Sequence, residues 1–526
     1  MKQYNNYADL ITFTRASSGT ALRPISYGDE LVTNGTFDTD VSGWSVQSNA
    51  TAVVTNGEVQ ITGDGGYNDA IQQQVSVEVG KVYRVQAVGR KITSDMRIQV
   101  REASNPYGTL SAKTFTSTSN ETFIGAFVAT QTVINIQLVQ YAGGAGSGAF
   151  DNISVREVLF DQPNGTLTLF NHPTNIPRIE YDSDGNRLGL LVEESRSNLL
   201  TYSEDFTQWT SLDVSLTVDA TQSPDGNENA TLLASTGSSA FPRINESLSI
   251  SSPTTLTFSI YVKENTGDNI FIRFAGTNFA GVGGTISVTS FEFATESFAT
   301  TSGTSATSTY QKLNNGWYRI AITLSGDTFT DIRVSPAFAE TNTDSTYIYG
   351  AQLEAGSFPT SYIPSNSGST TTRSADVASI GVSEFGFNQS EGTLFVEASG
   401  FLSSYSSPYS LNDGTSNNRV QPYKNNSDTS FGFDVTTGLS SQANIVQTVS
   451  SLNSGISHAA CYKDNDFSSA CNGILGTPDT SGSITTYTQL EIGKPSVTAN
   501  YLNGHLKSIK YYPRRLTNSQ LVEITS

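Results

Sequence analysis

Arginine and amide side chains alternate with apolar residues in the first third of the chain. Arg84 and Gln86 lie at every second position of one such segment, and Arg97 and Gln99 do so in the next. Guanidinium and amide groups carry paired donors that suit sugar hydroxyls and carboxylates. The spacing therefore predicts that these four residues share one sheet face and make glycan contacts there, with an ordinary solvated face as the alternative.

A second group of residues combines aromatic rings with cations. Between residues 256 and 324, the positions that alternate with apolar ones hold Tyr261, Lys263, Phe271, Arg273, Trp317 and Arg319. Aromatic rings can stack on pyranose rings while cations bind their polar groups. These six residues are further candidate glycan contacts. The alternative is that the aromatic residues pack beneath the connector or against a neighbouring subunit.

A third group of residues surrounds the segment LNDGTSNN at 411–418. It consists of Tyr405, Tyr409, Arg419 and Tyr423. Tyrosine and asparagine on loops at the rim of a sandwich are typical of adaptable binding surfaces. We predict glycan contacts here too, and loop tyrosines without a ligand are the alternative.

Residues for nucleophilic, acid–base or metal chemistry are scarce. The chain has two cysteines, Cys461 and Cys471, and three histidines that lie far apart. No G-x-S-x-G, H-E-x-x-H or phosphate-binding loop occurs. The E-x-D-x-E strand of concanavalin-like hydrolases is absent from 373–526. These features predict a protein that is not an enzyme and has no cofactor, no metal and two reduced thiols. A glycan depolymerase is the lesser alternative.

The charge balance limits the classes of partner. The 526 residues include 48 acidic and 29 basic ones, which gives a formal net charge of −19. Nucleic-acid binding needs clustered lysine and arginine, so no nucleic acid is expected. No run of about 18 apolar residues occurs, so no membrane insertion is expected. The segment MKQYNNYADLITF lacks the apolar region of a secretory signal, and none is predicted.

Alternation of apolar and polar residues at a period of two dominates the chain, and helical periodicity is almost absent. Short alternating runs that end at Gly, Asn, Asp or Ser predict antiparallel strands. Many such strands at regular spacing favour an all-β chain of tandem antiparallel sandwiches. The composition of 365–372, SNSGSTTT, predicts a flexible linker.

Two segments are similar to each other and indicate a duplication. ELVTNGTFDTDVSGWSV at 30–46 and NLLTYSEDFTQWTSLDV at 198–214 both show an apolar start, a phenylalanine and then a tryptophan. Because the order recurs in both copies, Trp44 and Trp209 are predicted to lie in the cores of the two modules.

Several motifs resemble those of modular proteins of tailed bacteriophages. The matching segments are FTRAS (13–17), PRIEYDSDGNRLGLLVEESRSNLLTYSEDFTQW (177–209), GWYRIAITL (316–324) and YIYGAQLEAGSFPTSYIP with TRSAD (347–376). EGTLFVEAS (391–399) and the segment LNGHLKSIKYYPRRLTNSQL are similar to a concanavalin A-like lectin domain. The resemblance covers roughly two thirds of the chain and implies a virion or tail fibre protein with carbohydrate-binding-like jelly rolls.

The first module interrupts the order of motifs that is usual in this family. In the family, the TRAS segment leads within a short distance to the R-x-x-Y-D segment, whereas here a module lies between them. The expected divisions are a lead-in at 1–30 that packs with 159–196, carbohydrate-binding-like sandwiches at 31–158 and 197–365, a connector β-hairpin at 159–196, and a lectin-like sandwich at 373–526. Insertion is tolerated where chain ends lie close together at a surface. Phe13 is therefore expected to pack beside the strands of 166–192.

These features predict a phage virion protein, tail-associated or a surface fibre, that adheres to host or environmental polysaccharide. It would assemble in the host bacterial cytoplasm. Its expected partners are other virion proteins, a host surface glycan and further copies of itself, with a trimer favoured. The alternative is a capsid-decorating or head-fibre protein that stabilises or ornaments the shell.

Overall fold

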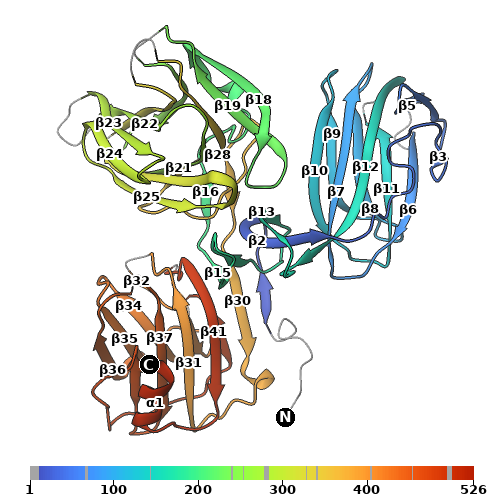
Figure 1. Cartoon of the computed structure of the whole chain (residues 1–526). Helices are drawn as coiled ribbons and strands as arrows, with labels where there is room; N and C mark the ends of the chain where they lie inside the picture. The colour runs from blue at the N-terminus through green and yellow to red at the C-terminus, as the bar shows by residue number, and fades with distance from the viewer. Residues whose placement is uncertain are drawn as a thin grey trace. The chain divides into compact units, whose positions relative to one another are not determined.

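The computed structural model describes residues 11–526 except 66–68, 142–143, 239–240, 253, 278–282, 327, 339–341, 403–404, 453 and 495–499. In these residues almost every element is a β-strand (Figure 1). The chain forms two compact units, residues 24–166 and residues 1–23 with 167–526. The first unit is therefore inserted into the second. The prediction of an all-β chain of antiparallel sandwiches, the first of them inserted, is confirmed.

The inserted unit, here called the inserted sandwich, consists of two antiparallel sheets. The five-stranded sheet has the order β3 (Ser45–Gln47), β6 (Ala70–Ser76), β11 (Val133–Gln140), β8 (Met96–Glu102) and β9 (Thr109–Phe115). The other sheet contains β10 (Glu121–Val128), β7 (Val82–Lys91) and β12 (Gly146–Phe160), with β5 (Glu58–Gly63) and the last residues of β2 (Gly19–Tyr27) on β12, and β4 (Thr51–Thr55) on β5. Strand β13 (Thr166–His172) follows β2 in the sheet order, but the first residues of β2 and nearly all of β13 belong to the larger unit. The unit is longer than the predicted 31–158 because residues 25–27 pair with 158–160.

The core of the inserted sandwich follows from strand alternation. Side chains on successive residues of a strand point to opposite faces, so apolar residues at every second position gather on one side. Ile98 on β8 and Ile136 on β11 are fully buried in this core, as is Val85 on β7. Trp44 is buried there as well, beside the ring of Phe37 at 5.4 Å. The prediction that Trp44 is a core residue is confirmed.

The larger unit contains a second sandwich, the middle sandwich. One sheet has the order β17 (Thr210–Leu212), β20 (Arg243–Ile250), β27 (Thr328–Ser335), β22 (Asn269–Thr277), β23 (Gly283–Glu292) and β24 (Ser297–Gly303), here called the β22 sheet. The facing β21 sheet has the order β18 (Val214–Gln222), β19 (Glu228–Ser235), β28 (Ser345–Ala355), β21 (Thr254–Glu264), β26 (Trp317–Gly326) and β25 (Thr307–Lys312). Their inner faces share one apolar core.

Trp209 has the same place in the middle sandwich as Trp44 has in the inserted one. Its ring is buried beside Phe206, with centroids 5.5 Å apart. Its Nε1 donates to the carbonyl of Tyr202 at 2.9 Å, just as Trp44 Nε1 donates to Asn34 at 3.1 Å. The predicted core position of Trp209 is therefore confirmed, and the two copies share a local device for closing one end of the sandwich.

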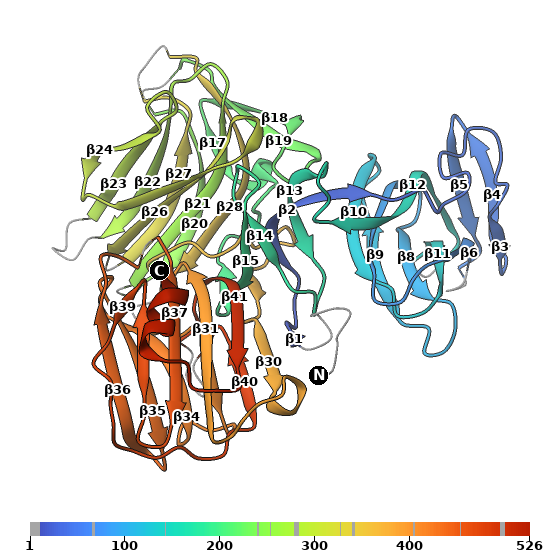
Figure 2. The ribbon, with the colours of Figure 1, turned by 60° about the horizontal axis from the view of Figure 1, so that its bottom comes forward.

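The C-terminal sandwich contains strands from three separate parts of the chain. One sheet has the order β1 (Thr12–Thr14), β30 (Val377–Gly381), β40 (Gln489–Ile492), β33 (Tyr409–Asn412), β34 (Arg419–Asn425), β35 (Ser430–Thr437) and β36 (Ser440–Thr448), with β32 (Tyr405–Ser406) on β34. The other has the order β14 (Ile179–Tyr181), β15 (Arg187–Val192), β41 (Gly504–Tyr512), β31 (Glu391–Ser399), β37 (Ile456–Lys463), β38 (Ser468–Cys471) and β39 (Ile474–Leu475). Helix α1 (Asn518–Thr525) covers the outside of this second sheet, where Leu521 is fully buried (Figure 2).

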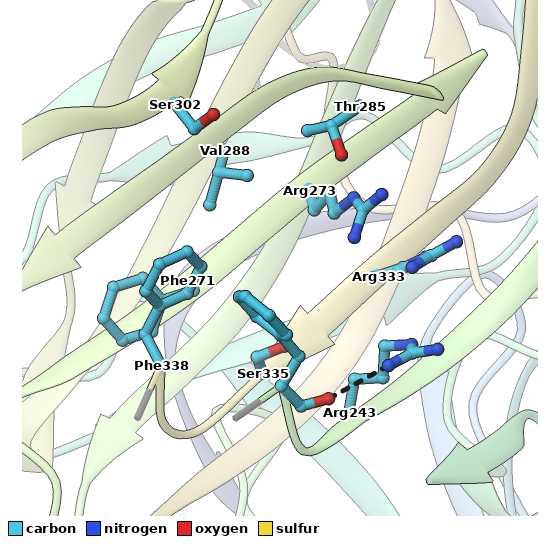
Figure 3. A pocket seen from close by; sticks show the side chains of 10 residues that line it. Arg243, Phe271, Arg273, Thr285, Val288, Ser302, Arg333, Ser335 and Phe338 are labelled. Carbon is cyan, nitrogen blue, oxygen red and sulfur yellow. Dashed lines mark hydrogen bonds between the residues drawn. The ribbon is translucent and has the colours of Figure 1, made fainter. Parts of the chain in front are cut away.

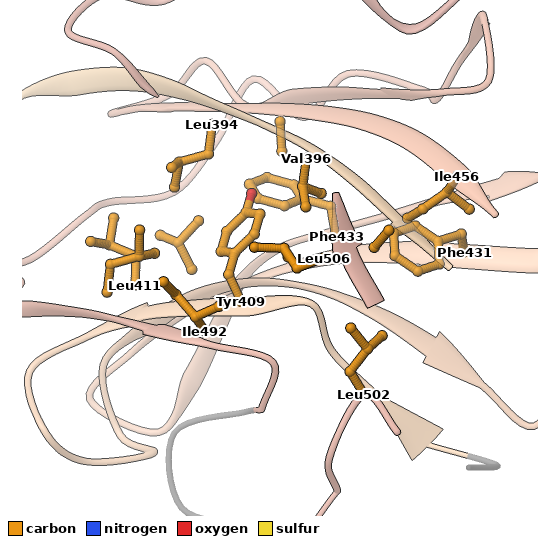
Figure 4. Packing of buried hydrophobic residues seen from close by; sticks show 14 of the residues in the cluster. Leu394, Val396, Tyr409, Leu411, Phe431, Phe433, Ile456, Ile492, Leu502 and Leu506 are labelled. Atoms are coloured by element: carbon orange, nitrogen blue, oxygen red, sulfur yellow. The ribbon is translucent and has the colours of Figure 1, made fainter. Parts of the chain in front are cut away.

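Strand β1 of the lead-in and the hairpin β14–β15 of the connector belong to the C-terminal sandwich. The connector hairpin β14–β15 joins the sheet because β15 pairs with β41. Phe13 lies in the same core as Leu190 and Val192, but its strand β1 pairs with β30, not with a strand of the connector. The expectation that Phe13 packs beside the strands of 166–192 therefore holds for the core, while the backbone of β1 pairs with a strand that follows the middle sandwich. Figure 4 shows the same core around Tyr409, Phe431 and Phe433.

A buried ion cluster joins the lead-in, the connector and the segment after the middle sandwich. Arg15 Nη1 lies 3.2 Å from Asp376 Oδ1, and Arg178 contacts the other carboxylate oxygen of Asp376. Arg178 also lies 2.8 Å from Glu193, which Arg373 approaches to 3.4 Å. All five side chains are buried. Every member belongs to one of the phage-like motifs, so these motifs are explained by folding contacts.

The opposite charges of the arginines and the carboxylates in the cluster compensate one another. Burial would raise the pKa of Glu193, but Arg373 and Arg178 together hold that pKa well below its ordinary value. Burial, followed by the charge of Arg178, lowers the pKa of Arg15 to about 10. Glu193 thus remains ionised at neutral pH, as a buried carboxylate can when it has partners of opposite charge.

The segment 365–372 is part of the folded structure. Ser365 is buried and accepts from the backbone of Ser203 at 2.6 Å. Residues Thr371–Arg373 form β29, which pairs with β16 (Arg196–Asn198). The prediction of a flexible linker was wrong because the Ser- and Thr-rich composition also suits an edge strand whose backbone is paired.

The two cysteines lie on opposite sides of one sheet. Cys461 on β37 packs beneath α1, whereas Cys471 on β38 faces the sandwich core. Both are free thiols, and burial raises the pKa of Cys461 to about 11 and that of Cys471 to about 12. In the described part of the chain, no helix is long and apolar enough to cross a membrane.

His458 on β37 is fully buried against Phe431, with ring centroids 5.1 Å apart. Neither ring nitrogen has a hydrogen-bond partner in the described residues. Burial lowers the pKa of His458 to about 3. An unfolded histidine has a pKa of about 6.5, so between these values the unfolded chain binds a proton that the folded chain does not. This histidine therefore destabilises the fold increasingly as the pH falls below about 6.5.

Replacing His458 by leucine should remove this dependence on pH. One such group changes the free energy of unfolding by about 1.4 kcal/mol per pH unit below its unfolded pKa. Between pH 7 and pH 5 the parent should therefore lose about 2 kcal/mol more stability than the variant does. Denaturant unfolding at the two pH values measures this. Equal loss of stability in both proteins between pH 7 and pH 5 would contradict the assignment.

Candidate functional site

The polar side chains of the inserted sandwich lie on two different outer faces. Arg97 and Gln99 are on β8 of the five-stranded sheet, whereas Arg84 and Gln86 are on β7 of the other sheet. The prediction that they share a face is therefore corrected: alternation tells core from surface but does not tell which sheet a strand joins. Arg84 donates to Gln86 at 2.8 Å and lies over the ring of Tyr27.

The outer face of the five-stranded sheet has a row of hydrogen-bonded glutamines. Gln137 on β11 lies between Gln99 on β8 and Gln72 on β6 in the register. Gln99 Nε2 donates to Gln137 Oε1 at 2.8 Å, and Gln137 Nε2 donates to Gln72 Oε1 at 2.9 Å. All three side chains are half-buried. Each bond fixes two amides, so the row presents its remaining N–H groups and oxygens in a set order.

An arginine and a tyrosine lie on each side of Gln99 along the direction of β8. Arg97 stacks on Tyr141, 4.7 Å from its ring centroid. Arg101 donates through Nε at 3.2 Å and Nη2 at 2.8 Å to the carbonyl of Tyr107. Tyr141 is 47% exposed and Tyr107 is 53% exposed. Arg97 and Arg101 are four residues apart on one strand, a length of about 13 Å.

Two polar atoms on this face have no partner of their own. Arg97 Nε and Asn135 Oδ1 are buried and make no hydrogen bond with the described residues. Arg101 lies opposite Asn135 in the register. Buried polar groups normally have a partner. We use the name amide face for Gln72, Gln99, Gln137, Asn135, Arg97, Arg101, Tyr107 and Tyr141.

Two of the predicted aromatic contacts in the middle sandwich are buried. Tyr261 and Trp317 lie on the outside of the β21 sheet, where Leu22 and Leu169 pack over them. Trp317 is 2% exposed, and its Nε1 donates to the carbonyl of Gln222 at 3.1 Å. Their proposed role as glycan contacts is wrong, because apolar residues of the lead-in and β13 already cover the rings. The alternative reading, packing beneath the connector, describes them.

The cations beside these rings are half-buried. Arg319 stacks on Tyr261 at 5.5 Å and donates to Ser259 at 3.0 Å. Lys263 lies on the same strand as Tyr261 and pairs with Trp317 and Tyr347 in the register. Arg319 therefore contacts residues of its own sheet. In the described structure, the predicted aromatic and charged residues form no exposed cluster around it.

Phe271 and Arg273 lie on the outer face of the β22 sheet, on the other side of the middle sandwich. The six predicted residues are thus divided between two sheets with the core between them. Phe271 and Arg273 line a hollow of about 130 Å³ (Figure 3). Its charged lining consists of Arg243, Arg273 and Arg333, its aromatic lining of Phe241, Phe271 and Phe338, and the rest of Thr285, Val288, Ser302 and Ser335. We call it the arginine hollow.

Two of the three arginines in the arginine hollow form no ion pair with a described acidic residue. Arg333 forms a two-pronged ion pair with Asp331. Arg273 is opposite Arg333 in the register and has no hydrogen bond or ion pair to any described residue. Arg243 donates one hydrogen bond, to the carbonyl of Phe241 at 3.0 Å. Burial, and then the charge of Arg333, lower the pKa of both Arg243 and Arg273.

The predicted rim of the C-terminal sandwich is only partly at the surface. Tyr409 is fully buried in the core because its position on β33 points inward (Figure 4). Its assignment as a glycan contact is therefore wrong. Arg419 forms an ion pair with Asp434 at 2.8 Å. Tyr423 is 8% exposed and stacks on Tyr405, which is 38% exposed.

The tyrosine pair lies flat on its sheet. The two rings are 5.7 Å apart with an angle of 4° between them. Tyr423 donates to Asn444 at 2.8 Å and passes over Gly432, where a Cβ would lie 2.4 Å from the ring. Only the Tyr405 side of this stack is open to solvent. It is a smaller polar–aromatic surface than the amide face.

Reasoning from the sequence missed the residues that complete these surfaces. Tyr107 and Tyr141 follow β8 and β11, and nothing in the sequence shows that the carbonyl of Tyr107 accepts from Arg101 or that the ring of Tyr141 stacks on Arg97. Phe338 also lies beyond the end of its strand, β27. A signal existed for Arg333, which alternates with Ile332 and Val334 in the same way as Arg273 alternates with its apolar neighbours.

No protein-family model and no curated protein matches the sequence. Among solved structures, the chain is similar to a carbohydrate-binding module described as "CBM4 structure and function", at 21% identity over 24% of this chain and 99% of that one, with a TM-score of 0.22. It is also similar to the CBM22-1–CBM22-2 tandem of Paenibacillus barcinonensis Xyn10C, at 13% identity over 62% and 98%, TM-score 0.22. These are likenesses of fold, and no functional argument rests on them.

A third match corrects an expectation from the sequence. Trypanosoma rangeli sialidase in complex with the inhibitor DANA matches at 10% identity over 96% of this chain and 99% of that one, with a TM-score of 0.23. An enzyme therefore stands among the similar structures, and the prediction that this chain is not an enzyme is withdrawn. In the described residues, no group of three or more His, Cys, Asp or Glu is placed to hold a metal ion.

Proposed function

We propose that this protein binds polysaccharide through the amide face of the inserted sandwich, as an adhesive component of a bacteriophage virion. The observation that carries the proposal is the row Gln72–Gln137–Gln99, which is held by its own hydrogen bonds. An arginine in contact with an exposed tyrosine lies on each side of its Gln99 end. The virion setting is supported by the resemblance of the sequence motifs to those of phage modular proteins.

The amide face suits an uncharged sugar chain for a physical reason. Each hydroxyl group of a sugar both donates and accepts, and each amide in the row keeps one N–H and one oxygen lone pair available. Because the amides are already ordered, binding costs less side-chain entropy than it would for freely rotating glutamines. Tyr107 and Tyr141, both exposed, offer apolar ring surface on the two sides of Gln99, which suits the apolar faces of pyranose rings.

Repetition would convert weak contacts into firm attachment. A single open face without a deep pocket binds a sugar chain weakly, whereas several linked copies raise the effective concentration at each site. We therefore propose a homo-oligomer, with a trimer favoured, built into the virion with other virion proteins. A tail or surface-fibre position places such copies near a host surface glycan.

Binding of the assembled full chain to a panel of neutral polysaccharides tests this function. Affinity electrophoresis with xylan, mixed-linkage glucan, galactomannan and dextran should show retardation by at least one of them. Retardation by none, with an oligomer confirmed in solution, would contradict the proposal. Antibody labelling of virions tests the position: label on the tail or on surface fibres supports it, and label confined to the head favours the capsid-decorating alternative.

A further inference from the structure

In the described structure, the positive charge of the arginine hollow exceeds the negative charge of the residues around it. Arg243, Arg273 and Arg333 converge on it from three neighbouring strands, β20, β22 and β27 (Figure 3). Asp331 is engaged by Arg333 through two contacts. Arg243 and Arg273 form no ion pair with any residue that the structure describes. The nearest acidic influences on Arg243 are Asp331 and Asp213, and both act at a distance.

This arrangement is unfavourable in the unliganded protein. The Nε atoms of Arg243 and Arg273 are buried and lack a hydrogen-bond partner in the described structure. Each guanidinium also repels the others, and even a half-buried cation such as Arg243 or Arg273 costs some folding free energy when it has no partner. An anion in the hollow would supply acceptors for these donors and offset the repulsion. Planar carboxylates match the forked donors of arginine particularly well.

The rest of the lining indicates more than a simple inorganic anion. Phe271 stacks on Phe338 at 5.0 Å, and Phe241 meets Phe338 edge-on at 5.0 Å. Phe241 is 45% exposed, so part of this aromatic wall is open to a ligand. The hydroxyls of Ser302, Ser335 and Thr285 complete the lining. A ligand that matches all three features has a carboxylate, hydroxyl groups and an apolar ring face.

We propose that the arginine hollow binds an acidic sugar residue of a polysaccharide, such as a uronic acid, through its carboxylate. Arg273 is the principal donor, Arg243 the second, and the phenylalanine wall contacts the sugar ring. This site is on a different sandwich from the amide face, and it takes a different class of ligand. It therefore goes beyond the function proposed above, and a separate measurement tests it.

Isothermal titration of the full chain with tri-galacturonate tests this proposal, with the fully methyl-esterified trimer as the uncharged reference. The acid should bind about tenfold or more tightly than the ester, because charge-assisted hydrogen bonds are lost in the ester. Arg273→Met should remove that difference. Equal binding of acid and ester by the parent, or an undiminished difference in Arg273→Met, would overturn the proposal.

Two further readouts separate this site from its alternatives. Arg84→Met, which removes an arginine from the inserted sandwich, should leave tri-galacturonate binding unchanged; an equal loss in both variants would overturn the site. Inorganic phosphate should compete weakly, since it does not contact the phenylalanine wall; competition as strong as that of the trimer would overturn the sugar assignment. Arg273→Met should not lower the melting temperature, because it removes an uncompensated charge, and it should leave any neutral-polysaccharide binding intact.

Discussion

Replacing Asp376 by alanine should destabilise the larger unit by about 3–5 kcal/mol, because it removes one partner from a buried network of charges. Asp376 accepts from Arg15 at 3.2 Å, from Arg178 and from the backbone of Glu193 at 2.9 Å. Without it, Arg15, Arg178 and Arg373 remain buried against Glu193 alone. The free energy of unfolding from guanidinium denaturation, followed by far-UV circular dichroism, measures the loss.

A surface pair in the same unit provides the control. Lys463 lies 3.2 Å from Glu391, but its side chain is 50% exposed. Lys463→Ala should therefore change the stability by less than about 1 kcal/mol. If Asp376→Ala were as mild as this control, the ion cluster would not be what joins the lead-in to the connector.

Replacing Gln137 by leucine should weaken binding to a neutral polysaccharide by roughly tenfold or more. Gln137 is the middle amide of the row, and its loss removes both hydrogen bonds that order Gln99 and Gln72. The variant also loses the donor and the acceptor that Gln137 itself would offer a sugar, each worth about 1 kcal/mol. Affinity electrophoresis against the polysaccharide that retards the parent most strongly gives the ratio.

Gln86→Leu is the matched control for this variant. Gln86 is also a half-buried glutamine on an outer face of the inserted sandwich, but on the opposite sheet. It should bind as the parent does. Equally weakened polysaccharide binding in both variants would indicate a general change in the unit. Normal binding by Gln137→Leu would show that the amide face is not the binding surface.

The fold was predictable because strand alternation is a local property. Apolar residues at every second position, such as Ile98 and Ile136, identify the core side of a strand without knowledge of its neighbours. The same pattern does not reveal which sheet a strand joins. For this reason Arg84 and Arg97, and likewise Trp317 and Arg273, were assigned to common faces although their strands belong to different sheets.

The sites were less predictable because they depend on contacts between distant residues. Arg15 and Asp376 are 361 positions apart, so their motifs were visible in the sequence but their ion pair was not. The arginine hollow needs Arg243, Arg273 and Arg333 on adjacent strands, and adjacency follows from the sheet order. Tyr141 acquires its place only because the loop after β11 brings its ring to Arg97.

The most direct test of the central claim is a crystal structure of the full chain with an oligosaccharide derived from the neutral polysaccharide that it binds best. The account predicts sugar rings on the five-stranded sheet of the inserted sandwich, with hydroxyls bonded to Gln137 and Gln99 and ring faces near Tyr107 or Tyr141. An oligosaccharide bound elsewhere, with this face empty, would contradict it.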